Sequence, residues 1–204
     1  MKAIGISVAT AFVAASAHGS MVSFTSNPGL EGLGSFTGSM EWAYPVEGGD
    51  CGELAIRLVN TSPGENGGFL TGFAFNTISG LDIAFITQGD RWTGVAGVAA
   101  DPFGVFDYGV ALDGNFLGGG SPVDGIAVGG ERKFLFTVCA EASVLEALQA
   151  SDFFDESAGF GFVARFKGFN DDGSDKVTAS LPSPGALALF ACAGIGSRAR
   201  RRRA

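Results

Sequence analysis

The chain has 204 residues, of which 46% are hydrophobic, 33 are glycine and 19 are phenylalanine. This composition excludes an intrinsically disordered chain, and the length allows one domain of ordinary size around a single core. All 21 acidic residues lie between Glu31 and Asp175, whereas five of the 13 basic residues fall in the last seven positions. The middle of the chain therefore holds seven basic residues against 21 acidic ones, a formal net charge of −14. Such a domain repels phosphate backbones, so we expect no nucleic-acid partner.

The N-terminus has the layout of a secretory signal peptide. Lys2 supplies a positive charge, residues 3–15 form an apolar run, and Ala15-Ser16-Ala17 offers an Ala-x-Ala cleavage site. The run is too short to span a bilayer comfortably. We expect residues 1–17 to form a signal helix that signal peptidase removes, so that the protein is exported. The alternative is a buried N-terminal helix.

Residues 18–180 read as a β-rich domain. Phe36, Met40, Trp42 and Tyr44 fall on one face of a strand over residues 35–44. Further strand-like segments, separated by turn signals such as Asp-Gly and Gly-Gly, cover residues 53–60, 69–77, 81–87, 105–112, 132–139 and 160–166. This spacing predicts an all-β fold, a single jelly-roll-like β-sandwich.

One short helix is expected near residues 143–151. Ser143 and Glu146 have the spacing of a capping box, with Ser143 as N-cap, and Val144, Leu145 and Leu148 give the segment an apolar face. We expect this helix to pack over an edge or end of the sandwich.

Two cysteines lie in the exported segment. Cys51 opens one predicted strand and Cys139 ends another, whereas Cys192 lies in an apolar run near the C-terminus. Export permits a disulfide between Cys51 and Cys139, and the positions of the strands allow it to join two sheets. Two separate buried thiols are the alternative.

The sequence offers little for catalysis. His18 is the only histidine, so a Ser-His-Asp triad or a His/Cys zinc site within the core is excluded, and we expect no enzymatic activity and no resident cofactor. The acidic turn at residues 170–175 is a weak candidate for Ca²⁺, with Asn170, Asp172 and Asp175 as oxygen ligands. Solvated turn carboxylates are the simpler interpretation.

Aromatic side chains suggest a second kind of site. Trp42, Tyr44 and Trp92 would form a platform for an extracellular polysaccharide if they were exposed. Packing in the core is the alternative, because Trp42 and Tyr44 share a strand face with Phe36 and Met40.

The C-terminus has three parts in a fixed order. A proline motif, Pro182-Ser183-Pro184-Gly185, precedes an apolar run over residues 186–196. The chain then ends in an arginine cluster formed by Arg198, Arg200, Arg201, Arg202 and Arg203. The apolar run is shorter than the ~20 residues of a stable span, and the arginines would stay on the cytoplasmic face. A plain membrane anchor is the alternative to a processed signal.

This tail, residues 181–204, resembles the PEP-CTERM sorting signal, with Pro-Ser-Pro in place of Pro-Glu-Pro. The resemblance implies a short transmembrane helix that holds the precursor transiently in the inner membrane until an exosortase, a transpeptidase-like membrane enzyme, processes it. Residues 54–76 and 164–177 are similar to β-sandwich ectodomains that carry such tails. The resulting expectation is a structural protein of the cell surface or extracellular matrix; the alternative is a secreted carbohydrate-binding module on the same scaffold.

Overall fold

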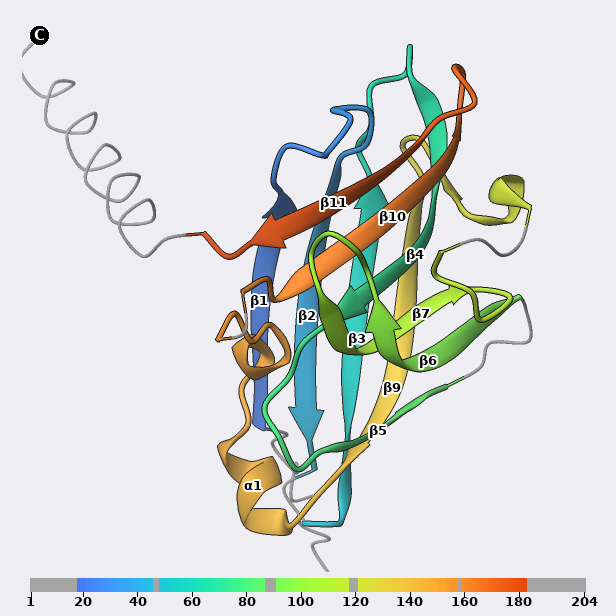
Figure 1. Ribbon diagram of the computed structural model, residues 1–204. Coiled ribbons are helices and arrows are strands. Elements are labelled where there is room, and N and C mark those ends of the chain that lie inside the picture. Colours follow the sequence, from blue (N-terminus) through green and yellow to red (C-terminus); the bar gives the residue numbers. More distant parts are fainter. Residues whose placement is uncertain (1–17, 46–47, 87–90, 118–120, 158, 183–204) are drawn as a thin grey trace, which may run out of the picture.

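The computed structural model describes residues 18–45, 48–86, 91–117, 121–157 and 159–182. Strands dominate these residues, and one short α-helix and two 3₁₀ turns accompany them (Figure 1). The strands are β1 (His18–Ser26), β2 (Phe36–Tyr44), β3 (Cys51–Asn60), β4 (Gly67–Phe75), β5 (Asp82–Phe85), β6 (Trp92–Ala99), β7 (Val105–Leu112), β8 (Ile126–Ala127), β9 (Glu131–Cys139), β10 (Phe162–Phe169) and β11 (Ser174–Ser180). The 3₁₀ turns η1 (Pro122–Asp124) and η2 (Ala150–Phe153) and the helix α1 (Ala142–Ala147) complete the described elements.

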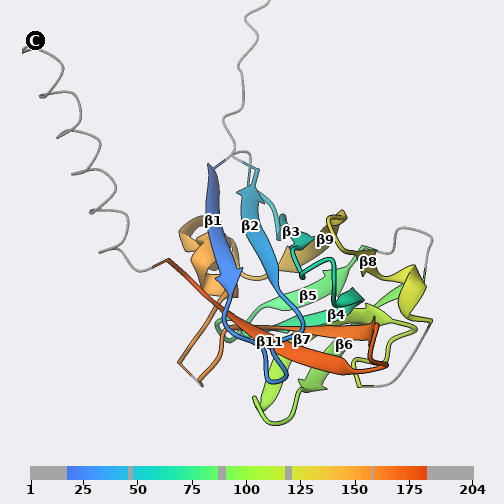
Figure 2. The same ribbon diagram turned by 90° about the horizontal axis from the view of Figure 1, so that it is seen from above.

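The strands form one continuous antiparallel sheet that curls nearly into a barrel. Their order is β5-β9-β3-β2-β1-β11-β10-β4-β7-β6, with β8 added to β4. The two halves of the sheet meet where Thr25 and Ser26 of β1 pair with β11. Seen from above, β1, β2, β3 and β9 lie on one side and β11, β4, β7 and β6 on the other (Figure 2). At the open seam, the backbone N–H of Phe85 in β5 donates to the hydroxyl of Tyr108 in β7 at 3.2 Å.

The predicted strand faces form the core. Phe36, Met40, Trp42 and Tyr44 are all buried on one face of β2. Gly38 lies on the same face, where a Cβ atom would come within 2.5 Å of the ring of Phe24, so that only glycine fits there without a shift. Burial of this aromatic layer supplies the main hydrophobic stabilisation of the fold.

A second, smaller apolar cluster lies outside the main core. The β6–β7 hairpin runs in front of β4 and β10 (Figure 1). Its cluster comprises Ala74, Val98, Ala100, Phe106, Ala111, Phe116 and Val163. The hairpin therefore covers part of the outer face of β10 and brings the loop at residues 100–104 next to β11.

The all-β prediction is confirmed, and the prediction for the helix needs correction. The helix α1 ends at Ala147 rather than near residue 151, because Leu148 is extended and the chain then turns into η2. Ser143 lies inside α1, whose N-cap is Glu141, so the predicted capping box with Glu146 is wrong. A capping box does occur at η2, between Gln149 and Asp152. The predicted signal helix at residues 1–17 and the C-terminal helix lie outside the described residues.

Candidate functional site

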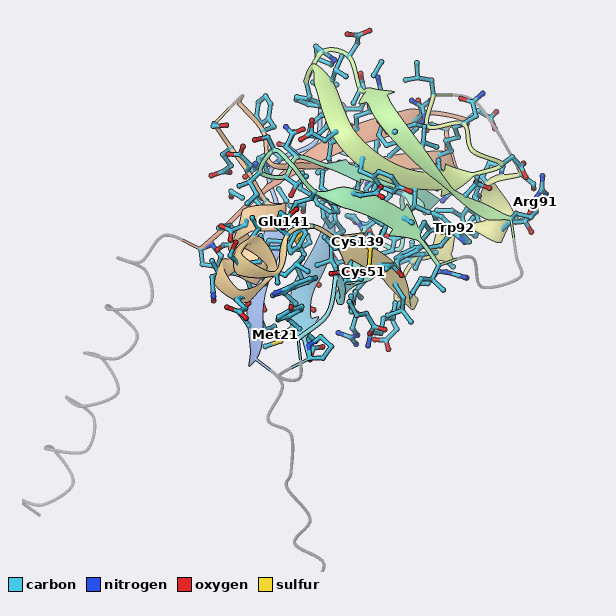
Figure 3. All side chains as sticks on the ribbon, turned by 90° about the horizontal axis from the view of Figure 1, so that it is seen from below. Met21, Cys51, Arg91, Trp92, Cys139 and Glu141 are labelled. Carbon is cyan, nitrogen blue, oxygen red and sulfur yellow. A yellow bond between two sulfur atoms is a disulfide. The ribbon has the colours of Figure 1, made fainter. Side chains whose placement is uncertain are left out.

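A disulfide joins Cys51 to Cys139 (Figure 3). The two residues are directly opposite each other in the register of β3 and β9, with their Cα atoms 4.0 Å apart. The backbone N–H of Ala140 donates to the carbonyl of Asp50 beside them, so the cysteines occupy a position at which antiparallel strands come closest. The bond therefore links neighbouring strands of one sheet, and not two sheets, which the strand positions had also allowed.

The three aromatic residues proposed as a sugar platform belong to the core. Trp42, Tyr44 and Trp92 are each no more than 2% exposed. The ring of Trp92 packs edge-on against Phe134, and the guanidinium of Arg132 lies over both rings. None of the three can present a ring face to a polysaccharide, so the alternative of core packing is correct for this set.

The acidic turn uses its carboxylates within the fold. Asp175 is only 2% exposed, and its oxygens accept the backbone N–H groups of Glu31, Leu33 and Gly34 at 3.0–3.1 Å. Asp172, by contrast, is exposed at a left-handed position, with φ of 60°.

Asn170 donates its side-chain amide to the carbonyl of Glu65 at 2.8 Å. Asp175 therefore has a structural role, and the weak Ca²⁺ candidate formed by Asn170, Asp172 and Asp175 loses one of its three ligands. Within the described ranges, no three His, Cys, Asp or Glu side chains are grouped so that they could hold a metal ion.

A hollow of about 590 Å³ opens beside the start of β7. Asp107 accepts the backbone N–H of Thr77 at 3.0 Å, and its own N–H donates to the side-chain oxygen of Asn76. Asp155 accepts the backbone N–H and the hydroxyl of Ser157, and these hydrogen bonds hold the pKa of its carboxyl below its usual range. The apolar part of the wall comes from Ile78, Leu81 and Val105.

This hollow has the chemistry of a binding site. Asp155, whose pKa is lowered by its hydrogen bonds with Ser157, carries a negative charge and can accept hydrogen bonds from a ligand. Carboxylates beside apolar side chains suit a ligand that carries hydroxyl or ammonium groups on a hydrocarbon frame. Sequence reasoning missed this hollow, because it joins three segments that are separated along the chain: the loop at residues 76–81, the start of β7 and the loop at residues 155–157.

Of the proline motif, only Pro182 belongs to the described residues, where it is exposed. Ser183, Pro184, Gly185 and the terminal arginines lie outside them. In the part of the chain that is described, no helix has the length and apolar character needed to cross a membrane. Comparison with protein families, curated proteins and solved structures finds no match for this chain.

Proposed function

We propose that this is an exported structural protein of the cell surface or extracellular matrix, without enzymatic activity. The observation that carries this proposal is the disulfide between Cys51 and Cys139, since such bonds persist in oxidising compartments outside the cytoplasm. A jelly-roll-like β-sandwich remains our interpretation of the curled sheet. It would serve as a stable acidic domain, consistent with the net charge of −14 over the middle of the chain.

The route to the surface is part of the same proposal. Signal peptidase would remove residues 1–17, and an exosortase would process the tail from residue 181 onward. The sequence layout supports this route: a proline motif, an apolar run and an arginine cluster in that order. Pro182 is exposed and follows β11, where the chain leaves the sheet. This position would give the enzyme access to the motif.

The route is tested by changing the proline motif. Replacing Pro182 and Pro184 together with alanine is expected to keep most of the precursor in the membrane fraction, because the motif that the enzyme reads is lost. Mass spectrometry of the membrane and surface fractions measures this. Pro28→Ala, a change far from the motif in sequence, is the matched control and should be processed like the natural chain. Normal processing of the double variant, or of the natural chain in a host without an exosortase, would contradict the route.

The hollow beside β7 favours carbohydrate binding as a second candidate function, through groups other than the buried aromatics. Asp107 and Asp155 would accept hydrogen bonds from sugar hydroxyls. Asp107→Asn is then expected to weaken binding to a responsive neutral polysaccharide by about tenfold, the cost of one charge-assisted hydrogen bond. Glu53→Gln, at an exposed position of β3, removes the same charge and should have no effect. Absence of binding across a broad polysaccharide panel would remove this candidate.

A further inference from the structure

Basic residues are scarce in the described domain, and those outside β10 and β11 all have interaction partners. Arg57 forms an ion pair with Glu131, and Arg91 pairs with both Asp113 and Asp124. Arg132 packs over aromatic rings. Arg165, Lys167 and Lys176 are the remaining three of the seven basic residues in the middle of the chain, and they form a cluster of positive charge.

These three side chains gather on the outer face of one hairpin. Phe166 in β10 and Val177 in β11 point into the main core, so by alternation Arg165, Lys167 and Lys176 point the other way. Arg165 lies directly opposite Lys176 in the register of the two strands. Like charges at directly opposite positions destabilise an antiparallel pair. Their presence here, in a domain with three times as many acidic as basic residues, calls for a compensating group.

The described residues supply only part of that compensation, through the negative charge of Asp101, which acts on Lys176. Neither Arg165 nor Lys176 forms an ion pair with a described carboxylate, and Lys176 instead donates to the backbone carbonyl of Asp101 in the β6–β7 loop. The Nε atom of Arg165 is buried and has no hydrogen-bond partner among the described residues.

Burial adds to this cost. It lowers the pKa of the Arg165 guanidinium, and it lowers the pKa values of Lys167 and Lys176, with the charge of Arg165 as a further cause. The charge of Asp101 opposes the shift at Lys176 without reversing it. An anion beside these groups would offset both the repulsion between the like charges and the cost of burying them. It would do so because it supplies an opposite charge and hydrogen bonds to partly desolvated cations.

A hollow of about 210 Å³ lies at this position, lined by Arg165, Lys176, Ser174, Leu30, Glu31 and Asp175. We propose that this hollow binds a compact oxyanion, a carboxylate or phosphate group, between Arg165 and Lys176. Ser174 offers a hydroxyl donor, while the oxygens of Asp175 are already engaged by backbone N–H groups. A net charge of −14 repels extended polyanions, so the site suits a single anionic group.

Isothermal titration of the purified protein with sodium phosphate or sodium glucuronate at low ionic strength tests the proposal. We expect saturable binding of at least one of them, and the stronger ligand identifies phosphate or carboxylate as the preferred group. Arg165→Gln and Lys176→Gln should each weaken that binding by about tenfold, as loss of a charge-assisted hydrogen bond implies. Arg57→Gln removes the same charge from β3 and should change the affinity by less than about twofold.

Glu31 supplies a test in the opposite direction. Its carboxylate lines the hollow and is exposed, so Glu31→Gln should leave the fold intact and tighten anion binding by about twofold to threefold. The proposal is overturned if neither anion binds saturably, or if Arg57→Gln weakens binding as much as Arg165→Gln does. Unchanged affinity in a folded Glu31→Gln variant would also count against it. These outcomes do not depend on whether the tail is processed.

Discussion

Replacing Cys51 and Cys139 together with serine is expected to lower the free energy of unfolding by about 4 kcal/mol. The bond closes a loop between residues that are 88 positions apart, and a crosslink of that span removes much of the conformational freedom of the unfolded chain. It also ties β3 to β9 at the end of the sheet, next to the short edge strand β5. Urea unfolding of the natural and variant proteins, followed by tryptophan fluorescence, measures the difference.

Reduction provides the control for this prediction. A thiol reductant should lower the stability of the natural protein to that of the double variant and leave the variant itself unchanged, because the variant lacks the bond. If the natural protein unfolds at the same urea concentration with and without reductant, the bond does not carry the stability assigned to it.

Asp175→Ala is expected to cost about 3 kcal/mol of stability. The buried carboxylate accepts three backbone N–H groups from the segment before β2, which lies more than 140 positions away in sequence. Removing it leaves these donors without a partner, and an unsatisfied buried donor costs about 1–3 kcal/mol. The same urea unfolding measures the loss.

The matched control for Asp175 is Glu31→Ala. It removes one negative charge from the same region, but Glu31 is exposed, so the change should stay within about 0.5 kcal/mol. Equal stability of the Asp175→Ala and Glu31→Ala variants would show that the buried carboxylate does not hold this segment in place.

The strands β2 and β3 were predicted because large apolar side chains alternate along them, whereas β4 was predicted as an apolar run. Leu54, Ile56 and Leu58 are fully buried in β3, as their spacing indicated. Four other strands were missed for physical reasons. The strand β8 has only two residues, too few to show a period. In β1 and β11, short polar residues alternate with few large apolar ones, and β6 is built largely from glycine, alanine and valine, whose pattern gives no clear period.

Sites were harder to predict than strands, because they depend on register and burial. The spacing of Cys51 and Cys139 left a disulfide open, but only the pairing of β3 with β9 places the two side by side. Asp175 lies in an acidic run that reads as a solvated turn, and nothing local indicates that its carboxylate points inward. The pairing of Arg165 with Lys176 would have followed from the turn between them, had β11 been recognised as a strand.

Intact-mass spectrometry of the protein recovered from the cell surface tests the central proposal most directly. Export and processing predict a chain that begins near His18, lacks the arginines from Arg198 to Arg203, and carries one disulfide between Cys51 and Cys139. A surface protein whose C-terminus is still Ala204 would contradict processing by an exosortase.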